Sequence, residues 1–192
     1  MAKVTLPPQA FMFVRPILLA GANVGGKPNF MEVGSGMVLS SDPPMVELPI
    51  RFRQLTLSGI LENRTFSVNL PSIDNAKELD YCGMVSGRDT DKVKDCNFTV
   101  FYGKLGTAPM IDQFPVNLEC RLLHILSSNI HAIVIGQIEA TYVSEEYMTD
   151  GKADAKKINP LVWFAERGEY LALGNTVGKS RSIGNGVKKI SR

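Results

Sequence analysis

The sequence has few of the residues from which enzymes most often build catalytic and metal sites. Its 192 residues include only two histidines, His124 and His131, and three cysteines, Cys82, Cys96 and Cys120. The histidines are not at a metal-ligand spacing, and the cysteines match neither a disulfide framework nor a zinc motif. No Gly-x-Ser-x-Gly motif is present either. These absences argue against a metal centre and against a Ser-His-Asp hydrolase.

No charge of one sign dominates the chain, and no apolar run is long. The formal net charge is +2 at pH 7, too small to steer the protein toward nucleic acid or a membrane surface. No segment is long enough to span a bilayer, and Met1–Pro8 lacks the apolar core of a signal peptide. Together with the sparse cysteines, this predicts a cytoplasmic protein that contacts neither nucleic acid nor membrane.

The chain contains instead a series of short apolar segments bounded by Gly, Pro, Asn or Asp, which is typical of strands. Strands are predicted at 13–22, 29–35, 37–40, 45–50, 65–70, 97–102, 116–126, 131–143, 160–164 and 169–173. Helices are predicted at 54–63 and after Ser72, with Thr56 and Ser72 supplying capping hydroxyls. We also predict a hairpin turn at 23–27, and at Gly136 either a bulge or a close backbone approach. This pattern predicts a mainly β barrel or sandwich with short helical insertions.

The end of the chain differs in composition, and we divide the sequence into a domain of residues 1–178 and a basic tail of residues 179–192. No acidic residue occurs from Asn175 onward. The tail is either solvated and partly disordered, or it folds over a partner subunit or an anionic ligand. Its basic residues are Lys179, Arg181, Lys188, Lys189 and Arg192.

The middle of the chain has the pattern of a ligand-site wall. The segment 66–72 is a strand that ends in polar residues, and the segment 81–92 follows as a short helix and a polar loop. Lys92 follows Ser86 and Gly87 on that loop. Lys92 is interpreted either as a cation beside an electron-accepting ring or as an ordinary surface lysine.

Other candidate binding groups lie on either side of this wall. Arg51 and Arg53 precede the helix near Thr56. In one interpretation, free helix amides and a guanidinium together hold a phosphate there. In the other, both arginines lie on a solvated edge strand. His131 begins an apolar strand and suits a binding role as well as a structural one. Phe164 either packs in the core or stacks on a ligand. His124, within a strand, is predicted to be structural.

These residues in this order resemble the flavoredoxin branch of the flavin reductase-like proteins, in the FMN-binding split-barrel superfamily. The resemblance covers the chain up to about Gly178. It rests on the ordered segments Pro16–Ala20 with Gly26–Asn29, Ser40–Val46, Phe66–Asn69, Ser86–Lys92 and Phe114–Cys120.

The resemblance implies a six-stranded antiparallel Greek-key split barrel, a homodimer, and one FMN per subunit near the subunit interface. It implies that Lys92 or a protonated His131 stabilises negative charge on the reduced flavin and is the catalytic group. Relatives often carry a bulky aromatic where this chain has Ser35, so one ring face would be less covered here. The implied FMN neighbours are Asn29, Ser35, Thr56, Lys92, His131 and Phe164, with Arg51, Arg53 and Thr56 near the phosphate.

The implied function is electron transfer through FMN, between NAD(P)H or a redox protein partner and an acceptor. Gly34 and Gly36 do not form the Gly-x-Gly-x-x-Gly dinucleotide-binding fingerprint, because Ser40 and Asp42 follow them instead of a helix. Any NAD(P)H would therefore bind only transiently. The alternative is a non-catalytic FMN- or ligand-binding protein on the same barrel, which Ser35 and the basic tail leave open.

Overall fold

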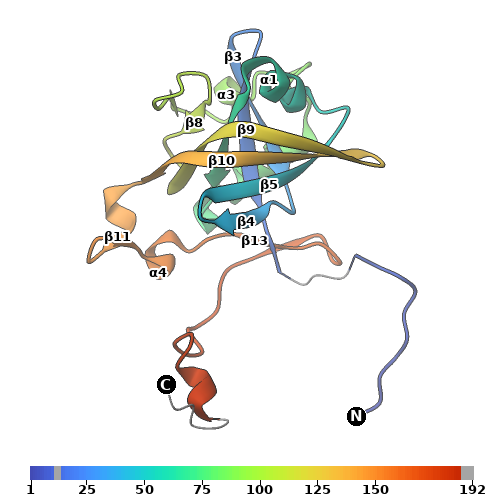
Figure 1. The fold of residues 1–192 in the computed structure, drawn as a ribbon, viewed down its shortest axis with the longest axis vertical. Helices are drawn as coiled ribbons and strands as arrows, with labels where there is room; N and C mark the ends of the chain where they lie inside the picture. The colour runs from blue at the N-terminus through green and yellow to red at the C-terminus, as the bar shows by residue number, and fades with distance from the viewer. Residues whose placement is uncertain (11–13, 187–192) are drawn as a thin grey trace.

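The computed structural model describes residues 1–10 and 14–186, and its main feature is a seven-stranded antiparallel sheet (Figure 1). The strand order is β3-β2-β6-β9-β10-β5-β4. The strands are β2 (Leu18–Val24), β3 (Lys27–Val33), β4 (Met37–Ser41), β5 (Pro44–Arg51), β6 (Thr65–Leu70), β9 (Val116–Ser128) and β10 (His131–Val143). The predicted mainly β fold is confirmed. The sheet has seven strands where the resemblance implies six, and within the described residues its edge strands β3 and β4 are not hydrogen-bonded to each other.

The connections follow a Greek-key path. Strands β6, β9 and β10 lie side by side in the order in which the chain enters this sheet, and β5, which precedes them in the chain, pairs with the other side of β10. The long β9–β10 pair changes register between Ile135 and Gly136, which confirms the predicted bulge. A Cβ at Gly136 would overlap the Phe66 ring, so the close approach of that ring to the strand requires glycine. The turn between β2 and β3 places Gly25 and Gly26 at positive φ, as predicted for a hairpin.

The helices are short and connect or cover the sheet. The predicted helix over 54–63 is confirmed as α1 (Leu55–Asn63), and Ser72 forms the predicted cap through a capping box with Asn75. The other helical elements are η1 (Ile73–Asn75), α2 (Ala76–Met84), α3 (Lys92–Asp95), η2 (Glu145–Tyr147), α4 (Ala155–Ile158) and η3 (Ile183–Gly186). The smaller sheets are formed by β1 (Arg15–Pro16) with β13 (Val162–Phe164) and β14 (Glu169–Leu171), β7 (Val100–Phe101) with β8 (Met110–Ile111), and β11 (Met148–Thr149) with β12 (Lys152–Ala153).

Strand β2 is buried on both faces, because its alternating side chains enter two different apolar clusters. Leu18 and Ala20 pack with the interior of the curved sheet, while Leu19 packs on the other side with Leu79 of α2 and with Phe98. The outer face of β2 and β3 is therefore covered by α2 and by the segment that follows it. This covering layer positions the 85–92 loop beside β3.

The two ends of the described chain leave the sheet on the side opposite α1 (Figure 1). Residues 1–10 and 171–184 are exposed along their whole length. The tail residues Lys188, Lys189 and Arg192 lie outside the described residues, and the division at residue 178 stays a prediction. Among the described residues, no helix combines the length and the apolar character needed to cross a membrane.

Candidate functional site

A cleft is lined by residues of the β2–β3 hairpin, the start of α1, the loop before α3 and α3 itself. These elements lie together at one end of the sheet (Figure 1). Its volume is about 780 Å³, within the range of small-molecule sites. A recess of about 30 Å³ adjoins it, large enough for about one or two water molecules. The cleft and the recess share four lining residues: Asn29, Leu55, Gly87 and Lys92.

Lys92 is buried between the cleft and the recess, so the interpretation as an ordinary surface lysine is wrong. Lys92 is the first residue of α3, and it is only 5 % exposed. The ammonium Nζ donates to the carbonyl oxygens of Phe30, at 2.9 Å, and Cys82, at 2.7 Å. A lysine ammonium has three N–H donors, so one remains for a third partner. Burial lowers the pKa of Lys92, against the opposing effect of nearby Cys82 and other acidic groups.

Asn29 and Thr56 are joined inside the wall of the cleft. Asn29 Nδ2 donates to Thr56 Oγ1 at 2.7 Å, and both residues are buried. The predicted capping role of Thr56 is wrong, because its hydroxyl is taken by Asn29 and the N-cap of α1 is Gln54, whose side chain makes no capping hydrogen bond. The first turn of α1 also has no acidic residue. The helix therefore starts at the cleft with amides that no side chain caps, which is an arrangement suited to an anion.

Two glycines allow the backbone to approach the site closely. A Cβ at Gly87 would overlap Asn29 Oδ1, and a Cβ at Gly83 would overlap Glu32 Oε2. The loop between α2 and α3 thus lies directly against side chains from β3. The basic residues that line the cleft are Lys27, Arg88, Lys92 and Lys94, against the acidic residues Asp89 and Asp91.

The other predicted site residues do not line the cleft or the recess within the single described chain. Arg51 and His131 face each other in register at the end of the β5–β10 pair, with Arg51 exposed and His131 partly exposed. Arg53 is exposed, and its carbonyl oxygen accepts a hydrogen bond from Arg88. Ser35 is exposed just after β3. Phe164 is half-buried at the end of β13, paired with Glu169 of β14.

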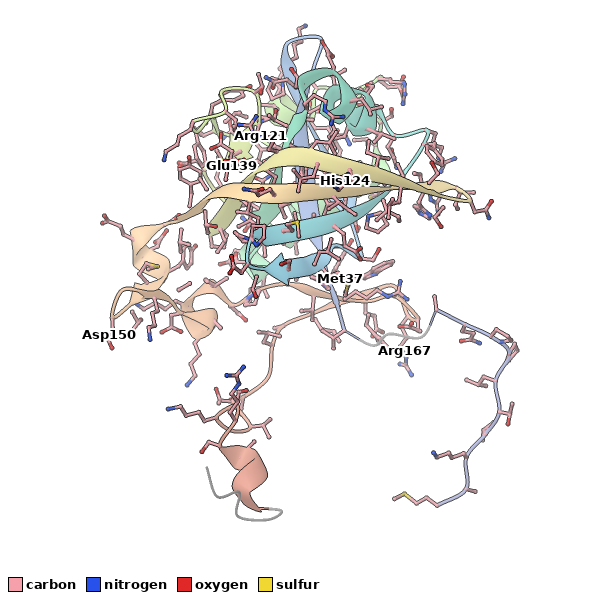
Figure 2. All side chains as sticks on the ribbon, viewed as in Figure 1. Met37, Arg121, His124, Glu139, Asp150 and Arg167 are labelled. Atoms are coloured by element: carbon pink, nitrogen blue, oxygen red, sulfur yellow. The ribbon has the colours of Figure 1, made fainter. Side chains whose placement is uncertain are left out.

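His124, predicted to be a structural histidine within a strand, is exposed on β9; Figure 2 labels its position. It lies opposite Ile135 of β10 in the antiparallel register. Further along the same two strands, Arg121 and Glu139 form an ion pair at 3.1 Å (Figure 2). Both partners are partly solvated, so the pair contributes little to stability.

Glu32 lines the recess from β3 and is not among the site residues predicted from the sequence. The Tyr170 hydroxyl lies 3.3 Å from Glu32 Oε1 and 2.8 Å from Asp80 Oδ1. The available signal was a single acid between Met31 and Val33, in a strand whose neighbours are buried. Periodicity alone does not reveal the partners, because Tyr170 is 138 residues away.

The chain is similar to known proteins over most of its length. The family model described as "Flavin reductase like domain" matches residues 11–172. Flavoredoxin from Methanosarcina acetivorans is 37 % identical with a TM-score of 0.92, covering 97 % of this chain and 100 % of that one. Flavoredoxin of Desulfovibrio vulgaris (Miyazaki F) is 28 % identical with a TM-score of 0.90, covering 95 % and 100 %. An uncharacterized protein of Archaeoglobus fulgidus is 29 % identical over 128 residues, covering 67 % of this chain and 72 % of that protein.

Proposed function

Because this chain belongs to the flavin reductase-like family, we propose that it is an FMN-binding flavoprotein that passes electrons from NAD(P)H or a redox protein to an acceptor. Similarity to two flavoredoxins over nearly the whole chain supports this proposal. The observation that carries it is the buried Lys92 ammonium between the cleft and the recess, with one N–H donor left for a ligand.

The residues of the cleft fit the two chemical parts of FMN. The uncapped start of α1 and the basic lining suit a phosphate, and Arg51 and Arg53 lie in the chain just before that helix. Leu55, Val93 and Phe98 provide apolar surface for a planar ring. Asn29 and Thr56 hold the wall in place through their hydrogen bond.

Lys92 has the clearest chemical role. When bound, FMN supplies a ring that accepts a hydride or two electrons and gains negative charge. Lys92 holds a positive charge at a position fixed by two backbone carbonyls, so little reorganisation is needed when that charge develops. Its burial strengthens the interaction, since electrostatic attraction grows as water is excluded. A protonated His131 is proposed to add to this stabilisation.

A second copy of the chain is proposed to complete the site. Five of the eight predicted FMN neighbours lie away from the cleft in one chain, and they are Ser35, Arg51, Arg53, His131 and Phe164. Edge strand β4 also exposes Met37, Val38 and Leu39, at 48 %, 69 % and 47 %. An exposed apolar edge is a typical site for association. A homodimer that covers β4 is therefore part of the proposal.

Titration of the purified protein with FMN tests the proposal. We expect FMN to bind with a change in its visible absorption and quenching or enhancement of its fluorescence. A protein that neither contains flavin nor binds added FMN contradicts the proposal and leaves another ligand for the cleft.

Rapid mixing of the FMN-loaded protein with NADH and with NADPH separates the two electron donors. Bleaching of the flavin absorbance by either nicotinamide supports a reductase. Bleaching by neither nicotinamide, but by a reduced redox protein, supports an electron carrier. Bleaching by no donor favours the non-catalytic FMN-binding alternative, for which the exposed Ser35 is the relevant observation.

A further inference from the structure

Three side chains from distant parts of the sequence meet behind the recess. Glu32 belongs to β3, Asp80 to α2 and Tyr170 to β14. The Tyr170 hydroxyl is 2.8 Å from Asp80 Oδ1 and 3.3 Å from Glu32 Oε1, so it lies between two carboxyl groups. All three residues are partly buried. The hydroxyl and the two carboxyl groups therefore form one hydrogen-bonded chain.

In this arrangement a single hydroxyl hydrogen serves two carboxyl groups. A phenol hydroxyl has a single hydrogen, and the shorter distance gives Asp80 the stronger of the two hydrogen bonds. Burial, followed by the hydrogen bond to Asp80, raises the pKa of Tyr170 well above its usual value, so the hydroxyl keeps its proton. The Tyr170 hydroxyl thus donates toward both Asp80 and Glu32, and a proton on Glu32 removes the repulsion between two partly buried carboxylates.

The surroundings of Glu32 also favour its protonated form. Burial is the largest cause that raises the pKa of Glu32, and the charge of Asp80 adds to it, while the Tyr170 hydrogen bond and the charge of Lys92 act in the opposite direction. The second oxygen, Oε2, lies against Gly83 so closely that a Cβ there would overlap it. Of the other titratable groups that line the recess, Cys82 belongs to α2 and Lys92 begins α3.

We propose that Glu32 is a proton-donating residue, which holds a proton at the recess wall and gives it to the bound flavin when two electrons arrive. This inference rests on the proposed function. Full reduction of a flavin takes two electrons and two protons. The electrons come from NAD(P)H or from a reduced redox protein. One of the two protons is delivered within the hydride of NAD(P)H or, with a redox protein, is taken from water. For the second proton, the O–H bond of Glu32 breaks and an N–H bond forms on the ring. Glu32 then recovers a proton from solvent through Tyr170 and the partly exposed Asp80.

The position of Glu32 is what distinguishes it from other acids of the chain. Its carboxyl group lines the same recess as Lys92, and the recess adjoins the cleft. Asp89 and Asp91 line the cleft as well, but both are exposed and have direct access to water. An acid in open water exchanges protons with solvent and stores none for a buried ring.

The first measurement needs no flavin. Carboxyl-¹³C-labelled glutamate is incorporated, and the Glu32 signal, assigned by its loss in Glu32→Gln, is followed by NMR from pH 3 to pH 9 in FMN-free protein. We expect Glu32 to titrate above the ordinary glutamate value of about 4.3. Asp80→Asn should lower that midpoint because it removes the negative neighbour, while Asp74→Asn, at an exposed acid, should leave it unchanged. A Glu32 midpoint at or below about 4.3 overturns the proposal.

The second measurement uses the FMN-loaded protein and dithionite, which requires no nicotinamide site. In wild type, the rate of flavin bleaching should fall as pH rises through the Glu32 midpoint. Glu32→Gln should be slower by about 100-fold at low pH and lose this pH dependence, because an amide donates no proton. Glu62→Gln, at an exposed glutamate on α1, should follow wild type. A Glu32→Gln protein whose bleaching rate depends on pH as in wild type overturns the proposal. Absence of FMN binding contradicts the proposed function instead, and the NMR titration then decides whether Glu32 holds a proton.

Discussion

A methyl group added at position 87 tests whether the cleft wall depends on close packing between the loop and β3. In Gly87→Ala, the new Cβ would overlap Asn29 Oδ1 and lie 2.9 Å from Asn29 Cγ. Ordinary van der Waals contact begins at 3.4 Å, so the amide carbon must retreat by about 0.5 Å and the oxygen by more. The 2.7 Å hydrogen bond from Asn29 to Thr56 would then reach the 3.2 Å limit of a normal bond or break.

The energetic consequence follows from burial. Thr56 is 1 % exposed and Asn29 is 8 % exposed, so water does not readily replace the lost partner. An unsatisfied buried polar group costs about 1–3 kcal/mol. We expect Gly87→Ala to lower the free energy of unfolding by that amount, which is about 2–4 °C in Tm per kcal/mol for a chain of this size. FMN affinity should fall as well, because Asn29 lines both the cleft and the recess.

Urea unfolding followed by circular dichroism measures the change. Gly174→Ala is the matched control, because a Cβ at Gly174 meets no atom within 4 Å. Asn29→Ala gives a second test: it removes the overlapping oxygen, so Gly87→Ala should cost much less in that background than in wild type. Equal stability of Gly87→Ala and Gly174→Ala, or an unchanged cost in the Asn29→Ala background, refutes the reasoning.

Three further predictions concern the ligand and the recess. Lys92→Met should still bind FMN but lower the flavin reduction potential. The control Lys77→Met, at an exposed site on α2, should leave the potential unchanged. An unchanged potential in Lys92→Met contradicts the proposed role. The pKa of Glu32 is raised on folding, so wild type should be stabilised relative to Glu32→Gln at low pH and should lose this advantage as pH rises through the folded-state pKa. Urea unfolding from pH 3 to pH 8 measures the difference in unfolding free energy between the two proteins. A stability advantage of wild type that grows with pH contradicts the prediction. Gly83→Ala should displace the Glu32 carboxyl group and shift its NMR midpoint, and an unchanged midpoint would show that the contact is not needed.

The β framework was predictable because its signals are local. The alternation along β9 and β10, the bulge at Gly136 and the capping box at Ser72 each depend on a few neighbouring residues. The strand predicted over 97–102 was too long, and only Val100–Phe101 pairs, since isolated strand propensity is overridden when few partners are available. The number of strands in the main sheet depends on long-range pairing that no local pattern contains.

The site was predictable only in part, because its decisive contacts join distant segments. Asn29, Thr56 and Lys92 were selected from the sequence, and all three line the recess. The burial of Lys92 could not be predicted, since its polar loop sequence is typical of a surface and one of its carbonyl partners belongs to Phe30, 62 residues away. The capping role given to Thr56 failed for the same reason, because a long-range partner took its hydroxyl.

The placement of the two described chain ends has a practical consequence for electrochemistry. Residues 1–10 and 171–184 leave the sheet on the side opposite α1, whereas the cleft opens beside α1 (Figure 1). A tether attached through either segment would hold the molecule on an electrode with the mouth of the cleft turned toward solution. Substrates and soluble donors would keep their access, but electrons from the electrode itself would have to cross the full width of the sheet. A tether on the exposed Lys94 side chain of α3 would reverse this orientation and shorten that distance.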